Sequence, residues 1–226
     1  MTAVRSPALN LAPALSLDSG DRLTRDEFHQ RYCTRTDIKK AELIQGVVYV
    51  ASPLRTAQHG IPHATVIGWL FAYVSPHAGL RVSDNATVFL GPDSEVQPDA
   101  CLIATPTRGG NARLTDDGYI TGAPELVVEI AASSASYDLH DKLEAYREAG
   151  VPEYIVWRTV DQAFDWFELH DGIYVRREPD AKGVIESRLF PGLRLNVTKL
   201  LAGDNTGVLA ELRRPSRQRA RRTAES

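Results

Sequence analysis

The stretch Glu125-Leu126-Val127-Val128-Glu129-Ile130-Ala131 decides the fold class of this chain. Apolar residues run almost without interruption through it, which is typical of a strand buried on both faces of an α/β sheet. Alternation of side chains places Glu129 on one face with Val127 and Ala131, and the other apolar residues on the opposite face. We therefore expect a sheet that further elements cover on both sides.

The residues after this strand predict a helix, a strand and a hairpin in turn. The helix is expected at about 139–149, where Asp138 can cap its start and Gly150 can end it. A strand is expected at 153–159. The sequence His170-Asp171-Gly172 predicts the turn of a hairpin, because aspartate and glycine tolerate the positive φ that such turns need. Its strands are expected at 163–169 and 173–177, and one more strand pair at 187–195 around Pro191-Gly192.

The residues before the central strand add further elements to the predicted sheet. Thr24-Arg25-Asp26-Glu27 fits a capping box that opens a helix through about Tyr32. Residues 42–50 predict a hairpin, and residues 57–74 an amphipathic helix with Pro62 in its first turn. Strands are expected at 80–90 and 100–104. This order of elements predicts an α/β fold with a mixed sheet, as in α+β proteins. Helices are expected to flank the central sheet, and a β-hairpin is added to it.

The length and composition favour one domain with tails. The chain has 226 residues, 43% of them hydrophobic, which is enough for a substantial core. We expect a disordered lead at 1–20, a domain at 21–205, and a basic, disordered tail at 206–226.

No apolar run approaches the roughly 20 residues that span a bilayer, and a secretory signal at 8–17 is a weak interpretation because Asn10 and Pro13 interrupt it. Two cysteines, Cys33 and Cys101, favour reduced thiols in a cytoplasmic protein.

The formal net charge of -3 conceals a strong asymmetry. Residues 212–226 hold six arginines and one acid, a local charge of +5, so residues 1–211 carry -8. A solvated terminus is one interpretation of this tail. The other is a tether for DNA, since a basic segment attracts a polyanion through counterion release. The arginines of this tail are Arg213, Arg214, Arg217, Arg219, Arg221 and Arg222.

Two acids lie in apolar, strand-like surroundings, Asp99 in Val96-Gln97-Pro98-Asp99-Ala100-Cys101-Leu102-Ile103 and Glu129 in the central strand. A carboxylate there is costly to bury unless a cation meets it. If the two converge with an amine, they form a divalent-metal site of the kind that cuts phosphodiester bonds. The alternative for Glu129 is a structural ion pair, and for Asp99 an ordinary turn residue, because Pro-Asp often begins a strand.

Lys142 is the nearest candidate for that amine. It lies beside the apolar stripe that Leu139, Leu143 and Tyr146 form on the predicted helix, so it points toward the rim of the sheet. The alternative is a snorkelling lysine whose stem packs while its amine reaches water. His59 and His63, four residues apart on a helix, suit a zinc site less well because no Glu follows His59 as in zinc proteases. Trp157, Trp166 and Phe167 are expected in the core or on a sheet face.

At this point several motifs together resemble the Uma2 family of endonucleases, within the PD-(D/E)XK nuclease superfamily, over roughly residues 22–195. Each motif is weak alone, whereas the ordered set is specific. The motifs are Glu42-Leu43-Ile44-Gln45-Gly46, His59, Val96-Gln97-Pro98-Asp99, Pro124-Glu125-Leu126-Val127-Val128-Glu129-Ile130, Asp138-Leu139-His140-Asp141-Lys142-Leu143, and Tyr146-Arg147-Glu148-Ala149-Gly150-Val151-Pro152-Glu153-Tyr154.

The resemblance implies a restriction-endonuclease-like core in which Asp99 and Glu129 hold Mg²⁺, with Mn²⁺ as an alternative ion. The superfamily places its lysine two residues after the glutamate, where this chain has Ala131, so Lys142 resembles the migrated lysine of the family. Glu42 is implied as an additional acid, and His59 as an accessory polar group.

We therefore expect a Mg²⁺-dependent DNA endonuclease that is not bound to a membrane. A homodimer is compatible with this activity, because two symmetric sites can cut both strands. The alternative is a non-catalytic DNA-binding or assembly module on a nuclease fold, which the acidic body of the chain favours.

Overall fold

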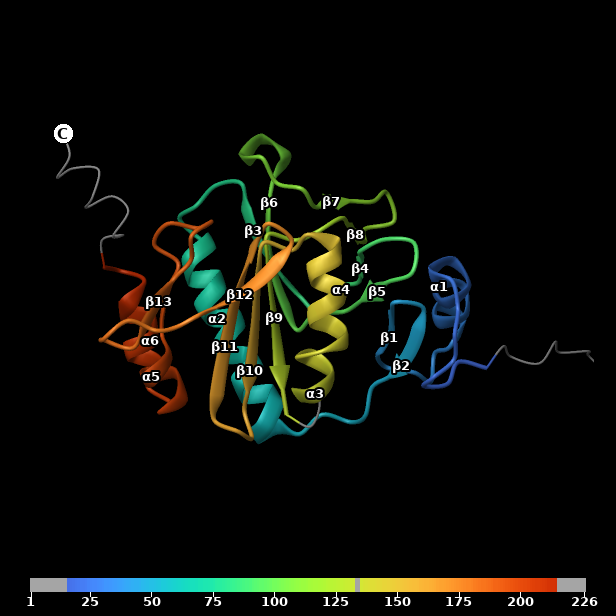
Figure 1. The fold of residues 1–226 in the computed structure, drawn as a ribbon, viewed down its shortest axis with the longest axis horizontal. Helices are drawn as coiled ribbons and strands as arrows, with labels where there is room; N and C mark the ends of the chain where they lie inside the picture. The colour runs from blue at the N-terminus through green and yellow to red at the C-terminus, as the bar shows by residue number, and fades with distance from the viewer. Residues whose placement is uncertain (1–15, 133–134, 215–226) are drawn as a thin grey trace, which may run out of the picture.

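The structure, a computed structural model, describes residues 16–132 and 135–214. Its strands form two six-stranded sheets and one two-stranded sheet. Figure 1 shows the larger sheet in the middle of the molecule, with helix α2 on one side of it and helix α4 on the other. None of the helices in the described ranges has the length and apolarity that crossing a membrane requires.

The larger sheet is mixed, as predicted. Its strand order is β12-β11-β10-β9-β6-β3, and β9 and β10 are parallel while every other neighbouring pair is antiparallel. The parallel pair is connected through α4, which is the short crossover that such a pair requires. These strands are β3 (Leu80–Asp84), β6 (Ala100–Ala104), β9 (Leu126–Ala131), β10 (Glu153–Arg158), β11 (Ala163–His170) and β12 (Ile173–Arg177).

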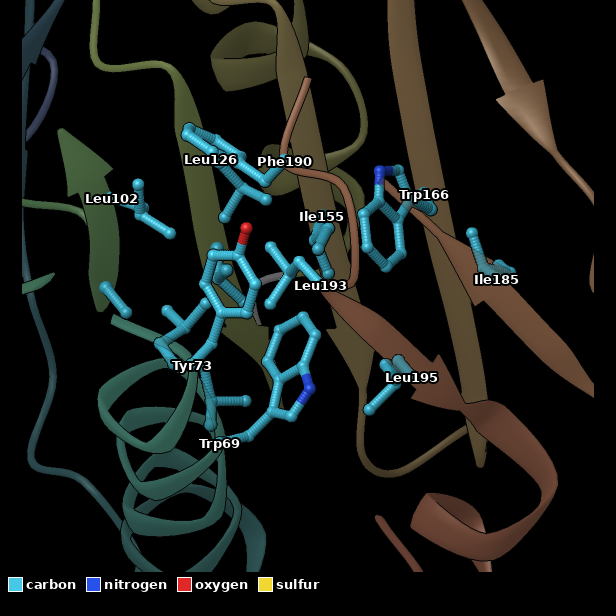
Figure 2. Close-up of a cluster of buried hydrophobic side chains, with 14 of the residues drawn as sticks. Trp69, Tyr73, Leu102, Leu126, Ile155, Trp166, Ile185, Phe190, Leu193 and Leu195 are labelled. Carbon is cyan, nitrogen blue, oxygen red and sulfur yellow. The ribbon is translucent and has the colours of Figure 1, made fainter. Parts of the chain in front are cut away.

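Strand β9 is covered on both faces, which confirms the interpretation of its apolar run. Leu126, Val128 and Ile130 belong to a core cluster that also contains residues of α2 (Ile61–Val74). Figure 2 shows Trp69 and Tyr73 of this helix directed toward the sheet. Trp157 and Trp166 lie in the same cluster, so their predicted core position is confirmed.

The opposite face of β9 packs against α4 (Asp141–Ala149) and the smaller sheet. Val127 and Ala131 share this second cluster with Tyr146 of α4 and Ile44 of the smaller sheet. Phe167 packs against this cluster and is partly buried. Glu129 therefore points to the layer between the larger sheet, α4 and the smaller sheet.

The smaller sheet has the order β2-β1-β5-β4-β8-β7 and contains the predicted hairpin. Gln45 and Gly46 form its turn with φ angles of 48° and 77°. Helix α1 (Arg25–Thr34) packs near this sheet and begins with the predicted capping box of Thr24 and Glu27. The strands are β1 (Ala41–Ile44), β2 (Val47–Val50), β4 (Val88–Phe89), β5 (Glu95–Val96), β7 (Arg113–Leu114) and β8 (Ile120–Thr121).

Several predicted boundaries differ from the structure. The strand expected at 80–90 is divided at Asn85, whose φ of 49° turns the chain from the larger sheet into the smaller one. The long helix is preceded by a π-helix, η1 (Thr56–Gly60). A short helix, α3 (Ala135–Asp138), precedes α4, and Asp138 does not cap α4, although Gly150 ends α4 as expected with a φ of 80°.

The C-terminal elements also lie outside the expected positions. The strand pair expected at 187–195 consists of β13 (Val184–Glu186) and β14 (Arg194–Asn196), with a turn between them. Helices α5 (Val197–Leu201) and α6 (Asn205–Glu211) follow, and Glu211 of α6 is buried against Arg194 at 3.0 Å. The first part of the expected disordered tail is therefore a packed helix. At the other end, Leu17 is 1% exposed, so the last residues of the expected lead pack as well.

Candidate active site

Five residues singled out in the sequence come from four separate elements and one connecting segment, and they gather beside β9. Asp99 immediately precedes β6, Glu129 lies inside β9, Glu42 lies in β1, Lys142 lies in α4, and His59 lies in η1. All five residues are buried, with exposed fractions of 2–6%. Burial of so many ionisable groups is uncommon unless they are paired, so their partners determine what the cluster can do.

Lys142 joins two of the acids. Its Nζ lies 2.9 Å from Oε2 of Glu42 and 2.9 Å from Oε1 of Glu129. Asp138 lies farther away, at 3.9 Å. The ammonium also lies 5.5 Å from the centre of the Tyr137 ring, which is suited to a cation–π contact. The snorkelling interpretation of Lys142 is therefore wrong, because only 2% of this residue is exposed.

Asp99 makes a separate set of contacts. One carboxylate oxygen, Oδ2, accepts a hydrogen bond from the backbone N–H of Ile130 at 2.8 Å, so it reaches the strand that carries Glu129. The same oxygen lies 3.1 Å from Nε2 of His59, and Oδ1 lies 3.4 Å from Nζ of Lys40. These contacts fix the Asp99 side chain beside β9, which is more than a turn residue at a strand entry requires.

His59 and His63 both contact Asp99, at different atoms. Nε2 of His59 contacts the Asp99 carboxylate, whereas Nε2 of His63 contacts the Asp99 backbone oxygen at 2.8 Å. His59 is held in place by η1, whose Gln58 carbonyl accepts a hydrogen bond from the Thr159 hydroxyl at 2.7 Å. Both histidines therefore position the segment that carries Asp99.

The pKa values of the two main acids of the cluster, Glu129 and Asp99, are shifted in opposite directions. Burial raises the pKa of Glu129 to about 8; Lys142 opposes this rise, and the carboxylates of Asp99, Asp138 and Glu42 add to it. Burial also acts to raise the pKa of Asp99, but the hydrogen bond from His59 and the charges of Lys40, His59 and Lys142 outweigh it and hold this pKa well below its usual range. The pKa of Lys142 is raised despite burial, because Glu129, Glu42 and Asp138 surround it. The cluster therefore contains an ionised Asp99 and a permanently charged Lys142.

The carboxyl groups of this cluster are chemically suitable donors for a divalent cation. Four buried carboxyl groups, those of Glu42, Asp99, Glu129 and Asp138, surround the two ammonium groups of Lys40 and Lys142. With these four carboxyl groups and two ammonium groups ionised and His59 neutral, the cluster has two more negative than positive charges, which an ion of charge +2 would balance. Carboxylate oxygens are the ligands that Mg²⁺ and Mn²⁺ prefer.

The described residues contain no group of three or more His, Cys, Asp or Glu side chains arranged to hold a metal ion. A site of two carboxylates completed by a backbone carbonyl, water and phosphate needs fewer side-chain ligands than that. Asp99 contacts the ammonium of Lys40, whereas Glu129 contacts that of Lys142, so each carboxylate has its own lysine partner. The ion pair of Glu129 with Lys142 is consistent with both interpretations of this glutamate, structural and functional.

Two side chains and one backbone N–H group near the acids were missed in the sequence. Tyr146 donates its hydroxyl to Oε1 of Glu129 at 2.8 Å, and it lies four residues after Lys142 on the same face of α4. Lys40 lies two residues before Glu42, so strand alternation places both on one side. The signal for both residues was thus their spacing from residues already singled out. Gln97 contributes through its backbone N–H, which donates to Oε1 of Glu42 at 2.7 Å and which no side-chain pattern reveals.

The basic tail begins away from this cluster. Arg213 and Arg214 are exposed after α6, which contacts α2 and β14, whereas Lys142 and Glu129 lie on the α4 side of β9. Arg214 lies 3.5 Å from Glu211. The other four arginines of the predicted tether, Arg217, Arg219, Arg221 and Arg222, lie outside the described residues.

Comparison with known proteins shows a family and a similar fold. The profile of the family described as "Uma2: Putative restriction endonuclease" matches residues 25–198. A crystal structure of a "putative nuclease belonging to DUF820" from Anabaena variabilis ATCC 29413 is similar in fold, with a TM-score of 0.61 at 18% sequence identity. The similarity covers 80% of this chain and 98% of that chain, and at this identity it shows the fold alone. No curated protein matches.

Proposed function

This chain belongs to the Uma2 family, with the restriction-endonuclease-like fold expected from its motifs, and we propose from this premise that it is a divalent-metal-dependent DNA endonuclease. The observation that carries the proposal is the buried Lys142 between Glu42 and Glu129, at 2.9 Å from each, next to the strand that Asp99 contacts. A purely structural core has no need of four buried acids around two lysines, because such groups are costly to desolvate.

Asp99 and Glu129 are the proposed metal ligands, with Mg²⁺ as the ion and Mn²⁺ as its substitute. When bound, such an ion would neutralise charge on the scissile phosphate and make an attacking water easier to deprotonate. Asp99 is suited to this task because its carboxylate stays ionised and its direction is fixed by the Ile130 N–H. Tyr146 holds the second ligand, Glu129, through its hydroxyl.

Lys142 supplies positive charge at a fixed place. Its ammonium is held by Glu42 and Glu129, so it needs little rearrangement to donate a hydrogen bond to a phosphate oxygen or to the attacking water. Glu42 positions Lys142 and is itself fixed by the Gln97 N–H. His59 positions Asp99.

Cleavage of supercoiled plasmid DNA tests the proposal. The wild type is expected to convert the plasmid to nicked and linear forms with Mg²⁺ or Mn²⁺ and to stop in EDTA. Asp99→Asn and Glu129→Gln should each lose the activity, since each removes a carboxylate without changing the size of the side chain. Glu178→Gln is the matched control, because Glu178 is exposed and lies far from the cluster in the sequence. All variants should be purified identically, so that a contaminating nuclease appears equally in each.

The second candidate function is a non-catalytic DNA-binding or assembly module. The acidic body, with -8 over residues 1–211, favours it because a polyanion must approach this surface. Calorimetric titration with Mn²⁺ separates the two functions. Binding that Asp99→Asn abolishes supports the nuclease, whereas a wild type that neither binds the ion nor cuts any plasmid supports the module.

We also propose how DNA reaches the site and where the protein acts. The arginines of the tail would raise the local concentration of DNA near an otherwise acidic body. A homodimer would place two sites on opposite strands, and light scattering after size exclusion tests it. Free thiols at Cys33 and Cys101 agree with a reducing cytoplasm.

A further inference from the structure

A cysteine, a histidine and a glutamate form a second array of reactive side chains, between α1 and the smaller sheet. Sγ of Cys33 lies 3.5 Å from Nε2 of His29. Nδ1 of the same histidine lies 3.0 Å from both carboxylate oxygens of Glu95. None of these residues takes part in the site around Lys142.

The fold holds the three groups in this order. Cys33 and His29 are four residues apart on α1, so their side chains lie on one face of the helix. Glu95 is 1% exposed and lies in β5, where it pairs with Leu43 of β1. The His29 ring is fixed by edge contacts with Phe89 at 5.3 Å and Tyr119 at 5.1 Å.

The contacts define a role for each group. A buried carboxylate that accepts the Nδ1–H of a neutral imidazole leaves Nε2 free to accept a proton, and Nε2 faces the thiol. This order of nucleophile, base and orienting carboxylate is the arrangement that activates cysteine and serine nucleophiles. Tyr119 adds a hydroxyl beside the sulfur, with which it forms a hydrogen bond.

A small molecule can reach this array. Cys33 is exposed, and a cavity of about 530 Å³ opens at His29 and Tyr119. Among the other residues that line it, three are acidic and one is basic: Asp26, Glu27, Asp117 and Arg25. The excess of negative charge favours a ligand that carries amines. The other cysteine differs completely, because Cys101 is 1% exposed and burial raises its pKa to about 12.

We propose that Cys33 is a covalent modification site for small disulfides that carry amines, with His29 as its base and Glu95 as a positioning residue. Nε2 of His29 takes the proton from Sγ, and Sγ attacks one sulfur of the disulfide. The disulfide bond breaks as the new bond to Cys33 forms, and the leaving thiolate takes the proton from His29. One mixed disulfide and one free thiol result, so the exchange needs no other oxidant.

The rate of reaction with cystamine, followed by mass spectrometry of the intact native chain, tests this proposal. One cysteamine should be added, at Cys33, and Cys33→Ser should abolish the addition. His29→Gln should slow it at least about tenfold, as expected for loss of a general base. His170→Gln is the matched control, because His170 also contacts a glutamate, Glu168, but lies on β11. Native Cys33 should also react faster than the thiols of the same chain in urea at equal pH, a comparison that needs no variant.

Two further measurements separate a chemical role from a structural one. Added imidazole should restore part of the rate in His29→Ala, and Glu95→Asp should retain more of it than Glu95→Gln. Cystamine should react faster than dithiodiglycolate, which carries carboxylates, and salt should reduce the difference. A native rate no higher than in urea, an unchanged rate in a folded His29→Gln variant, or addition at Cys101 would overturn the proposal.

Discussion

Replacing Lys142 by methionine tests whether this lysine balances the buried acids of the cluster. The substitution retains most of the volume of the side chain and removes the ammonium, which lies 2.9 Å from both Glu42 and Glu129. Breaking a buried ion pair by removing one partner typically costs about 3–5 kcal/mol, because a buried charge is left without compensation. For a domain of this size each kcal/mol lowers the melting temperature by about 2–4 °C, so a decrease on the order of 10 °C is expected.

Urea unfolding of the metal-free protein, monitored by tryptophan fluorescence, measures this loss. Lys182→Met is the matched control, since Lys182 is exposed, and we expect it to change the free energy of unfolding by no more than about 0.5 kcal/mol. The double variant Lys142→Met/Glu129→Gln should recover part of the lost stability, because it removes one of the two carboxyl groups that lose their contact with the ammonium.

The refuting result is a Lys142→Met variant as stable as the wild type with an unchanged dependence on urea concentration. It would show that the carboxyl groups do not need the ammonium, and the argument for a charge-balanced cluster would fail. The opposite result is that Lys142→Met is destabilised while the double variant is stable. The double variant is then a folded protein, so its loss of cleavage cannot be attributed to unfolding.

Three further predictions concern stability and DNA binding. The pKa of Glu129 in the folded protein, about 8, lies above its ordinary value of 4.5. Between these pH values the folded metal-free protein holds a proton that the unfolded chain releases. The free energy of unfolding should therefore fall as pH rises between about 4.5 and 8. Urea midpoints across this range should show the fall, and Glu129→Gln should flatten it; a slope that Glu129→Gln leaves intact would assign the proton elsewhere. Gly110→Ala should destabilise the protein by about 1–3 kcal/mol, because the new Cβ would lie 1.9 Å from the backbone oxygen of Ala104. Gly68→Ala in α2 is the control: its Cβ would meet nothing within 4 Å, so it should be neutral or stabilising by up to about 1 kcal/mol. Equal melting temperatures for the two alanine variants would contradict this difference. Deleting residues 215–226, which contain four arginines, should weaken DNA binding and reduce the salt dependence of log K by up to about 4, while changing these arginines to lysine should preserve both; an unaltered salt slope would show a tail that is only solvated.

The fold was predictable where a local pattern has a single physical solution. The uninterrupted apolar run of β9 is compatible only with burial on both faces, and Asp171-Gly172 adopts the positive φ angles that a tight hairpin needs. The strand expected at 80–90 failed because its apolar pattern continues past Asn85, while the chain changes sheets there. Which sheet a strand joins depends on partners distant in sequence, and alternation carries no information about them.

The candidate site was predictable in its residues but not in its pairing. An acid within an apolar run is conspicuous, and this feature identified Asp99 and Glu129. Periodicity placed Lys142 beside the apolar stripe, where a flexible lysine can either snorkel or turn inward. The inward position of Lys142 is stabilised by Glu42, which lies on the smaller sheet and supplies a second carboxylate. No spacing along the chain relates residue 42 to residue 142, so only the assembled fold could show this contact.

The packing around β9 favours a lysine on α4 over one on β9 itself. Position 131, two residues after Glu129, is occupied by an alanine that is fully buried in the cluster containing Tyr146. A lysine there would have to displace packed side chains, and overpacking a core is itself destabilising. Helix α4 lies over the same face of β9, and from it Lys142 reaches Glu129 and Glu42 together. Since Tyr146, one turn further along α4, holds the same oxygen of Glu129, the helix fixes the charge of the cluster and the direction of its glutamate as one unit.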